Sequence, residues 1–319
     1  MNKNSRIFIA GHKGLVGSAV YRNFTKKGYK NLYVIYKNKL DLKDSEKVNA
    51  YFKKNRIEYL IICAARAGGI LANSKYPVDF FNENILIQNS LLNAALKFNL
   101  KRTIFLGTSC IYPAKAKTPI KEDALLSGKL HPSNEAYAIA KIAGIKLCSA
   151  LYTQYKLDVV ALMPTNVFGL NDRYSEKMSH VIPAMILKFI RAKQNNSKFV
   201  KLWGDGTPKR EFIFSDDLAE AIYLVLKTSK KKLFKLCKKT FPLINVGTGY
   251  IYSIKELANE IKRKVKFEGK LIFDKNYPNG VLKKNLCTNL LKKLGWRPKI
   301  SLEQGLDIIF SEKLIKINK

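Results

Sequence analysis

The sequence predicts an α/β fold, with a doubly wound parallel sheet in the first half and a smaller C-terminal α/β lobe. Short apolar runs alternate with longer segments of helical periodicity over the first half, which is the pattern of consecutive βαβ units. The short runs are apolar throughout, as expected for strands that helices cover on both faces. After Pro164 this alternation changes, so we expect a separate lobe from there on.

Five strands and four helices are expected in the first half. The strands are Arg6–Ala10, Leu32–Tyr36, Tyr59–Ala64, Arg102–Thr108 and Val159–Met163. The helices are Leu15–Lys27, Ser45–Asn55, Val78–Phe98 and Glu135–Tyr155. Two further segments, Leu71–Pro77 and Pro113–Pro132, are expected to be long loops, which in a compact domain are often functional.

The second half is expected to contain less regular elements. They are helices at His180–Ala192, Ser215–Lys227 and Ser253–Lys264, and strands at Phe199–Trp203 and Leu243–Val246. Ser215 or Asp216 is placed to cap the second of these helices, and Glu256 to complete a capping box in the third.

These elements divide the chain into two parts. We expect residues 1–168 to form the sheet domain and residues 169–319 to form mainly a substrate-binding lobe. Because strand and helix patterns recur around residues 211–248, we expect the chain to return to the first sheet there.

Composition excludes several classes of protein. The chain has 319 residues, 47% of them hydrophobic, and a formal net charge of +34. Its lysines are spread along the whole length and are not interleaved with aromatic residues, so we expect no nucleic-acid partner and no membrane-surface partner. The positive charge is instead suited to gathering an anionic substrate.

Targeting and metal signals are not found in the sequence. No segment has the pattern of a signal peptide, and no apolar run approaches the roughly eighteen residues of a membrane span. The five cysteines show no CxxC spacing, which is typical of a reducing compartment and provides no metal-ligand motif. We therefore expect a cytoplasmic protein without a bound metal.

A glycine-rich segment follows the first predicted strand. Glycines at this spacing permit a tight turn, a close approach of backbone to phosphate, and close packing of helix on sheet. The segment lies between a strand and a helix, which is the context that a dinucleotide-binding loop of a Rossmann-type sheet requires. The predicted cofactor-binding residues are Gly11, His12, Lys13, Gly14, Leu15, Val16 and Gly17.

The end of the second predicted strand distinguishes between the two nicotinamide cofactors. An NAD enzyme normally places a carboxylate there for the ribose hydroxyls, but the first acid in this chain is Asp41. Lys13 and Lys37 are instead placed to face a 2′-phosphate, so NADP(H) is favoured over NAD.

Tyr137 and Lys141 form a candidate proton-transfer pair. Positions four apart are neighbours on one face of a helix, and an ammonium beside a phenol favours the phenolate. The same spacing occurs in three other places, so spacing alone is weak; these are Tyr33/Lys37, Tyr152/Lys156 and Tyr223/Lys227. Tyr137 is distinguished by its position after the fourth strand, whose carboxyl end carries Thr108 and Cys110.

Taken together, these features resemble the extended short-chain dehydrogenase/reductase family. Longer motifs are similar to those of the GDP-L-fucose synthases. They are Gly107–Pro113, Asn134–Gly144, Met163–Gly169, Ser179–Ala184, Trp203-Gly204 and Arg210–Phe212. Their order is the same over nearly the whole chain.

The resemblance implies NADPH-dependent conversion of GDP-4-keto-6-deoxy-D-mannose to GDP-L-fucose, by epimerisation at C3 and C5 and reduction at C4. It implies that Cys110 and His180 fill the roles of a base on one face and an acid on the other in the epimerisations, and that Tyr137 protonates the reduced oxygen, with Thr108 beside it. Lys141 would hold the ribose. The further cofactor contacts that it implies are Leu106, Gly107, Pro164, Thr165, Asn166, Val167 and His180.

The resemblance also implies a GDP-sugar site and a homodimer. The implied substrate residues are Lys188, Trp203, Arg210 and Asn279. The family commonly dimerises through the helices predicted at Val78–Phe98 and Glu135–Tyr155.

The chain departs from the family pattern at four places. Thr108 replaces serine, Lys188 replaces arginine, Asn279 replaces aspartate, and Arg66-Ala67 replaces a lysine–valine pair. These departures leave open a C4 reductase of a related GDP-4-keto-6-deoxy sugar such as a heptose, with or without epimerase activity. A non-catalytic NADP-sensing regulator is a remote alternative, because such a protein should have lost the tyrosine or the lysine.

Overall fold

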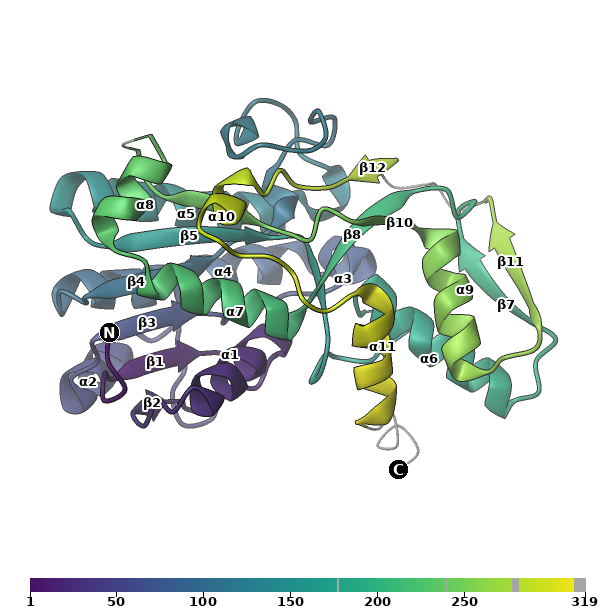
Figure 1. Ribbon diagram of the computed structural model, residues 1–319, viewed down its shortest axis with the longest axis horizontal. Coiled ribbons are helices and arrows are strands. Elements are labelled where there is room, and N and C mark those ends of the chain that lie inside the picture. The colour runs from purple at the N-terminus through teal and green to yellow at the C-terminus, as the bar shows by residue number, and fades with distance from the viewer. Residues whose placement is uncertain (177, 239, 277–280, 313–319) are drawn as a thin grey trace.

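A six-stranded parallel sheet forms the centre of the larger lobe (Figure 1). The computed structural model describes residues 1–176, 178–238, 240–276 and 281–312. The strand order is β2-β1-β3-β4-β5-β9. Their bounds are β1 Ile7–Ala10, β2 Leu32–Tyr33, β3 Tyr59–Ile62, β4 Arg102–Leu106, β5 Val159–Pro164 and β9 Leu243–Val246. The predicted fold class, a parallel sheet with a smaller second lobe, is confirmed.

The strand order reverses between β1 and β3. From β1 the chain moves outward to β2 and then crosses to β3 on the other side of β1. Ligands of open α/β sheets bind outside the carboxyl ends of the strands at such a reversal. The glycine segment that follows β1 therefore lies where a dinucleotide is expected.

Helices cover both faces of this sheet, and the strands present alternate residues to each. Ile7 and Ile9 of β1 belong to the core under one layer, and Phe8 and Ala10 to the core under the other. One layer contains α1 Leu15–Lys26, α7 Ser215–Lys227, α8 Lys230–Leu236 and α10 Asn289–Lys293. The other contains α2 Ser45–Asn55, α4 Pro77–Lys97 and α5 Glu135–Tyr155.

The smaller lobe has its own apolar core, between α6, α9, α11 and short strands. β8 pairs with β6, β10 and β12, while β7 pairs only with β11 among the described residues. The helices are α6 Val181–Gln194, α9 Ile254–Val265 and α11 Leu302–Ser311. The strands are β6 Asn166–Phe168, β7 Phe199–Trp203, β8 Lys209–Phe214, β10 Ile251–Ser253, β11 Lys270–Asp274 and β12 Lys283–Lys284.

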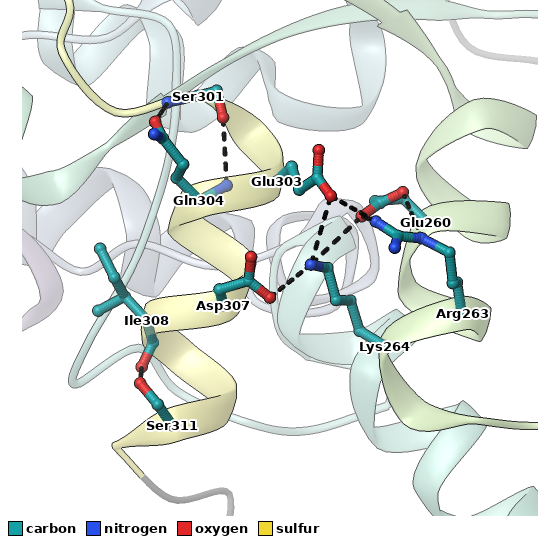
Figure 2. Close-up of polar contacts among 9 residues, drawn as sticks. All are labelled: Glu260, Arg263, Lys264, Ser301, Glu303, Gln304, Asp307, Ile308 and Ser311. Carbon is teal, nitrogen blue, oxygen red and sulfur yellow. Dashed lines mark hydrogen bonds and ion pairs between the residues drawn. The ribbon is translucent and has the colours of Figure 1, made fainter.

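Ion pairs join α11 to α9 at the surface of this lobe (Figure 2). Lys264 contacts Asp307 and Glu303, and Arg263 contacts Glu303 at 2.6 Å. Exposed pairs of this kind each stabilise by less than about 1 kcal/mol. The apolar side chains of α11, such as Leu306, therefore provide most of the attachment.

Several local predictions are wrong in detail. The predicted loop Leu71–Pro77 contains the helix α3 (Ile70–Lys75), because its short Ile-Leu-Ala-Asn-Ser-Lys run can form one and a half turns and shows no periodicity. The second strand is only two residues long. Phe214 occupies the N-cap of α7 and neither Ser215 nor Asp216 caps it, whereas the capping box of Ser253 and Glu256 is confirmed.

Among the helices of the described residues, none combines the length and apolar character that crossing a membrane requires.

Candidate active site

The glycine turn after β1 has the shape of a phosphate cradle. Gly11 has φ +87°, and its carbonyl accepts a hydrogen bond from Gly14 N at 3.0 Å. A Cβ on Gly17 would lie 2.1 Å from Gly11 O, so only glycine permits this approach of helix to turn. Gly14 is the N-cap of α1 and no side chain caps the helix, which leaves backbone N–H groups for an anion. These residues fit the pyrophosphate of a dinucleotide.

Tyr36, beyond the end of β2, links this turn to the region expected to hold the ribose. Its ring contacts the His12 ring edge-to-face at 5.3 Å, and Lys13 Nζ lies 4.7 Å from its centroid. Lys37 follows Tyr36 and is exposed. Asp41 forms an ion pair with Lys43 at 3.4 Å. The cations therefore gather where a 2′-phosphate is expected, while the nearest acid is already paired.

Thr108 joins the end of β4 to the start of α5. Its hydroxyl accepts a hydrogen bond from Cys110 N at 3.2 Å and so caps the 3-10 turn Ser109–Ile111. The same hydroxyl hydrogen-bonds with the Tyr137 phenol. Thr108, Cys110 and Tyr137 are only half-buried, so their reactive groups remain accessible. The structure thus brings three of the predicted catalytic residues together.

The phenol of Tyr137 is held in its protonated form. Burial raises the pKa of Tyr137, the nearby Cys110 adds to this, and the hydrogen bond with Thr108 opposes it. The expectation that Lys141 favours the phenolate is therefore wrong for this arrangement. A protonated phenol is suited to donating a proton.

The ammonium of Lys141 lies away from the phenol of Tyr137, which is why it does not favour the phenolate. Its Nζ donates a hydrogen bond to Leu106 O at 3.0 Å and is buried beside the thiols of Cys63 and Cys148. Burial lowers the pKa of Lys141 to about 8. The i, i+4 spacing puts both residues on one helical face, but Lys141 points to the sheet and Tyr137 to Thr108.

His180 is the N-cap of α6, and its side chain does not cap the helix. The residue is exposed by accessible surface, whereas protein atoms around the imidazole lower its pKa by burial. The imidazole is therefore partly desolvated, but solvent and a ligand can still reach it. The lowered pKa keeps the imidazole neutral at pH 7 and able to accept a proton.

Lys188 and Trp203 lie together in the smaller lobe. Lys188 Nζ is 5.7 Å from the centre of the Trp203 ring, which is 46% exposed and thus not core. Lys188 also lines a surface groove of about 320 Å³ that includes Arg191 and Lys201. This part of the lobe is suited to an aromatic base or an anionic group.

Arg210, on β8, lies close to one of the predicted catalytic residues. Its guanidinium donates to the carbonyl oxygens of Lys209 and Val281, at 2.9 and 2.5 Å, and lies near Cys110. Asn279, the fourth predicted substrate residue, lies outside the described residues.

Thr165 and Asn166 are fixed to β8 by hydrogen bonds. Thr165 Oγ1 and Asn166 Nδ2 donate to Glu211 O at 3.0 and 2.9 Å. Glu211 is fully buried, and its carboxylate accepts from Gly249 N at 2.7 Å and Leu286 N at 2.8 Å. Glu211 therefore bonds through its backbone to the predicted nicotinamide border and through its carboxylate to two other segments, and it lies on β8 next to Arg210.

Sequence reasoning missed a buried polar network behind Cys110. The hydroxyl of Tyr112 donates to Asn245 Oδ1 at 2.7 Å, and Asn245 N donates to Glu122 Oε1 at 3.0 Å. Asn245 Nδ2 also donates to the carbonyl of Ile120 at 3.0 Å. A lone asparagine in an apolar strand was the available signal, but nothing local identifies its partners.

Phe80 was also missed. Its ring contacts the Tyr137 ring edge-to-face at 6.1 Å, and it is almost fully buried. The Arg66 guanidinium lies 5.4 Å from the centre of the same ring. Phe80 therefore packs from α4 against Tyr137, the predicted proton donor.

A glycine phosphate turn at the sheet reversal, beside a tyrosine held at the end of β4, defines a nucleotide-dependent epimerase or reductase. A model described as the NAD dependent epimerase/dehydratase family matches residues 7–237. The chain belongs to this family.

Its relatives place it within the family more closely. It is 44% identical over 306 residues to a putative GDP-L-fucose synthase 2 of Arabidopsis thaliana, covering 96% of this chain and 90% of that one. It is 43% identical over 301 residues to the GDP-L-fucose synthase of Escherichia coli K12, covering 94% of each. A solved NADP-bound GDP-mannoheptose C4 reductase of Campylobacter jejuni is 35% identical, with TM-score 0.87 and 98% of both chains covered. The resemblance to GDP-L-fucose synthases is confirmed.

Proposed function

We propose that this protein epimerises GDP-4-keto-6-deoxy-D-mannose at C3 and C5 and reduces it at C4 with NADPH, giving GDP-L-fucose. The observation that carries the proposal is the joint placement of Thr108, Cys110 and Tyr137 at the carboxyl end of β4. Overall identity of 43–44% to GDP-L-fucose synthases supports the same substrate.

NADP(H) fits the residues that are present. The turn of Gly11, Gly14 and Gly17 accommodates the pyrophosphate, and Lys13 and Lys37 are available to the 2′-phosphate. When bound, the cofactor supplies the hydride for C4. Buried Lys141 donates to the Leu106 carbonyl at the end of β4 and is placed to hold the ribose, and Leu106, Gly107 and Pro164–Val167 form the neighbouring strand ends.

Tyr137 provides the proton of the reduction. As the C4 carbonyl becomes an alkoxide, the protonated phenol donates to its oxygen. The Thr108 hydroxyl, which contacts the phenol, stabilises the tyrosinate that results. A raised pKa suits this role, because the donor must stay protonated until charge develops on the substrate.

Cys110 and His180 exchange the protons of the epimerisations. The ketone acidifies the C–H bonds at C3 and C5, so a base can remove each proton and an acid can return one to the opposite face. His180 is neutral at pH 7 and can act as the base. Cys110, in the turn capped by Thr108, then serves as the acid on the other face.

Lys188, Trp203 and Arg210 are the proposed contacts to the GDP moiety, together with Asn279. Trp203 offers an exposed aromatic surface, and the cations offer charge to the diphosphate. The net charge of +34 favours an anionic substrate in general.

A C4 reductase of a related GDP-heptose is the second candidate. The similarity to the NADP-bound mannoheptose reductase favours it, as do Thr108, Lys188 and Arg66, which depart from the family pattern. The first candidate is preferred because identity to the fucose synthases is higher and because Cys110 and His180 are both present.

A homodimer in the cytoplasm is also proposed. α4 and α5 pack side by side, and their outer faces expose Val78, Leu86 and Ile139. All five cysteines are free thiols, which is consistent with a reducing compartment.

One experiment separates the candidates. Purified protein receives GDP-4-keto-6-deoxy-D-mannose and NADPH in D2O, and the product is examined by NMR. We expect an L-fuco product with deuterium at C3 and C5. Reduction without deuterium at these carbons would reject the epimerase assignment, and turnover of a GDP-keto-heptose alone would establish the second candidate.

A further inference from the structure

The two lobes touch at a double-glycine turn between β3 and α3. Gly69 N donates a hydrogen bond to Met178 O at 2.9 Å. A Cβ on Gly69 would lie only 2.2 Å from Ser179 O and 3.0 Å from Ser179 C. Gly69 has φ −69°, which any residue can adopt, so space alone requires glycine here. The turn therefore lies directly against the backbone that precedes His180.

Asn73 holds this turn in place. The side chain is buried, and its Nδ2 donates to Gly68 O at 3.0 Å and to Gly69 O at 2.9 Å. Its backbone N–H also donates to Gly69 O, at 3.1 Å. Two carbonyl groups of the turn are thus hydrogen-bonded to one buried side chain on α3.

The other end of the same segment reaches Tyr137. Arg66 forms ion pairs with Asp79 at 3.1 Å and Glu83 at 2.5 Å on α4. Its guanidinium lies on the Phe80 ring, and that ring packs against Tyr137. Residues 66–73 therefore contact the support of Tyr137 in one lobe and the backbone before His180 in the other.

We propose that Gly69 and Asn73 are positioning residues that set where the His180 imidazole stands relative to Tyr137 and Cys110. The catalytic meaning of this placement rests on the role proposed above for His180. No substrate contact is assigned to either residue. They act through the Met178–Ser179 backbone, which leads directly into His180.

A methyl group at position 69 has a direct consequence. The contact of 2.2 Å must open by about 1 Å, and because the obstructing atom belongs to the Ser179 backbone, His180 must move with it. A misplacement of about 1 Å can reduce a rate by about a hundredfold. The phosphate turn lies at another strand end, so the contacts of Gly11, Gly14 and Gly17 to the cofactor should be preserved, and only the contact implied for His180 should change.

The test compares Gly69→Ala, Asn73→Ala and Gly128→Ala. Asn73→Ala removes the two side-chain hydrogen bonds without adding an atom. Gly128→Ala is the control, since its Cβ would meet Pro113 Cβ at an ordinary 3.4 Å. The chain has only three histidines, so the His180 imidazole can be followed by NMR, with His12 and His131 as internal references.

We expect Gly69→Ala to shift the His180 resonances and to slow deuterium incorporation at least tenfold, a larger factor than any change in NADPH affinity. Asn73→Ala should show the same changes to a smaller extent, and Gly128→Ala neither. Unchanged His180 resonances in folded Gly69→Ala and Asn73→Ala proteins would overturn the inference. Loss of fold in Gly69→Ala together with a normal Asn73→Ala protein would do so as well.

Failure of the proposed function has a different signature. It would appear as no deuterium incorporation by the wild-type protein, whereas the His180 resonances of the variants would still decide whether Gly69 and Asn73 position the ring.

Discussion

Tyr137 and Lys141 lie one helical turn apart, yet their side chains have different surroundings. The phenol contacts Thr108 and belongs to a half-buried residue, while the ammonium is buried and donates a hydrogen bond to Leu106 O. Burial acts in opposite directions on the two groups, because it disfavours the charged form of each. It raises the pKa of Tyr137 and lowers that of Lys141.

The first prediction concerns Tyr137. Replacing it with Phe removes the proton donor but keeps the ring against Phe80, so reduction should slow by about 10²–10⁴-fold. NADPH affinity should change by less than about threefold, and deuterium should still enter the substrate. Stopped-flow oxidation of NADPH and cofactor titration measure these quantities.

A matched control lies on the same helix. Tyr152 also precedes a lysine, Lys156, by four residues. It lies near the C-terminal end of α5, and its ring packs against that of Phe241. Tyr152→Phe should therefore leave the reduction rate unchanged. Equal losses in both variants would contradict the role of Tyr137.

The second prediction concerns Lys141 and pH. Its pKa is about 8 in the folded protein and near 10.5 when unfolded, so the unfolded chain binds more protons between these pH values. Stability contributed by this group therefore rises as pH increases from about 8 to about 10.5. Below about pH 8 its burial destabilises the fold in full, on the order of 3 kcal/mol.

Lys141→Met should remove this effect. Without cofactor, the variant should be more stable than wild type at pH 7, and its advantage should shrink by about 1.4 kcal/mol per pH unit above pH 8. Urea unfolding at pH 7, 8, 9 and 9.5 measures the difference. A constant difference over this range would show that Lys141 does not titrate there.

At the scale of elements, long-range polar contacts fix the segment between β4 and α5. Asn245 of β9 is fully buried and bonds to Tyr112, to the Ile120 carbonyl and to Glu122. An asparagine side chain is expensive to bury unless its groups are paired. Asn245 therefore connects the edge strand β9 by hydrogen bonds to the loop that follows Cys110.

The third prediction tests how much these hydrogen bonds of Asn245 stabilise the fold. Asn245→Ala should lower the free energy of unfolding by about 2–4 kcal/mol, because it leaves the Tyr112 hydroxyl and the Ile120 carbonyl unpaired in the interior. Tyr112→Phe removes one bond only and should lower it by about 1–2 kcal/mol. If both variants stay within about 0.5 kcal/mol of wild type in chemical denaturation, the network does not stabilise the fold.

At the scale of the whole molecule, the outer faces of α4 and α5 are more apolar than a solvated helical surface requires. Val78 is 67% exposed, Leu86 49% and Ile139 42%. Exposed apolar residues on two helices that pack together are consistent with an interface. A second copy would bury them, in keeping with the proposed dimer.

The fourth prediction follows from this surface. Leu86→Lys should shift the protein from dimer to monomer in analytical ultracentrifugation, because burying an unpaired ammonium at an interface is unfavourable. Leu282→Lys, at a residue that is 69% exposed beside β12, should leave the dimer intact. A wild-type protein that sediments as a monomer at micromolar concentration would refute the proposed dimer.

Much of the larger lobe could be predicted from local pattern. Continuous apolar runs place β1, β3, β4 and β5, and helical periodicity places α4 and α5, since burial on one or both faces leaves a regular trace in the chain. The short helix α3 was not predicted, and the strand predicted at Leu32–Tyr36 is only two residues long. The six residues of α3 are too few to show a helical period, and they do not form the continuous apolar run that marks the buried strands.

The sequence by itself determined the parallel sheet, the glycine turn after β1 and the candidacy of Tyr137, Cys110 and His180, because each depends on spacing within one segment. Only the tertiary structure decided which partners those groups have. Lys141 bonds to a carbonyl 35 residues away, and Tyr112 to Asn245 across 133 residues. Gly69 meets Ser179 because two lobes pack together. Contacts between distant segments depend on how the packed elements are arranged in space, so the periodicity within one segment cannot predict them.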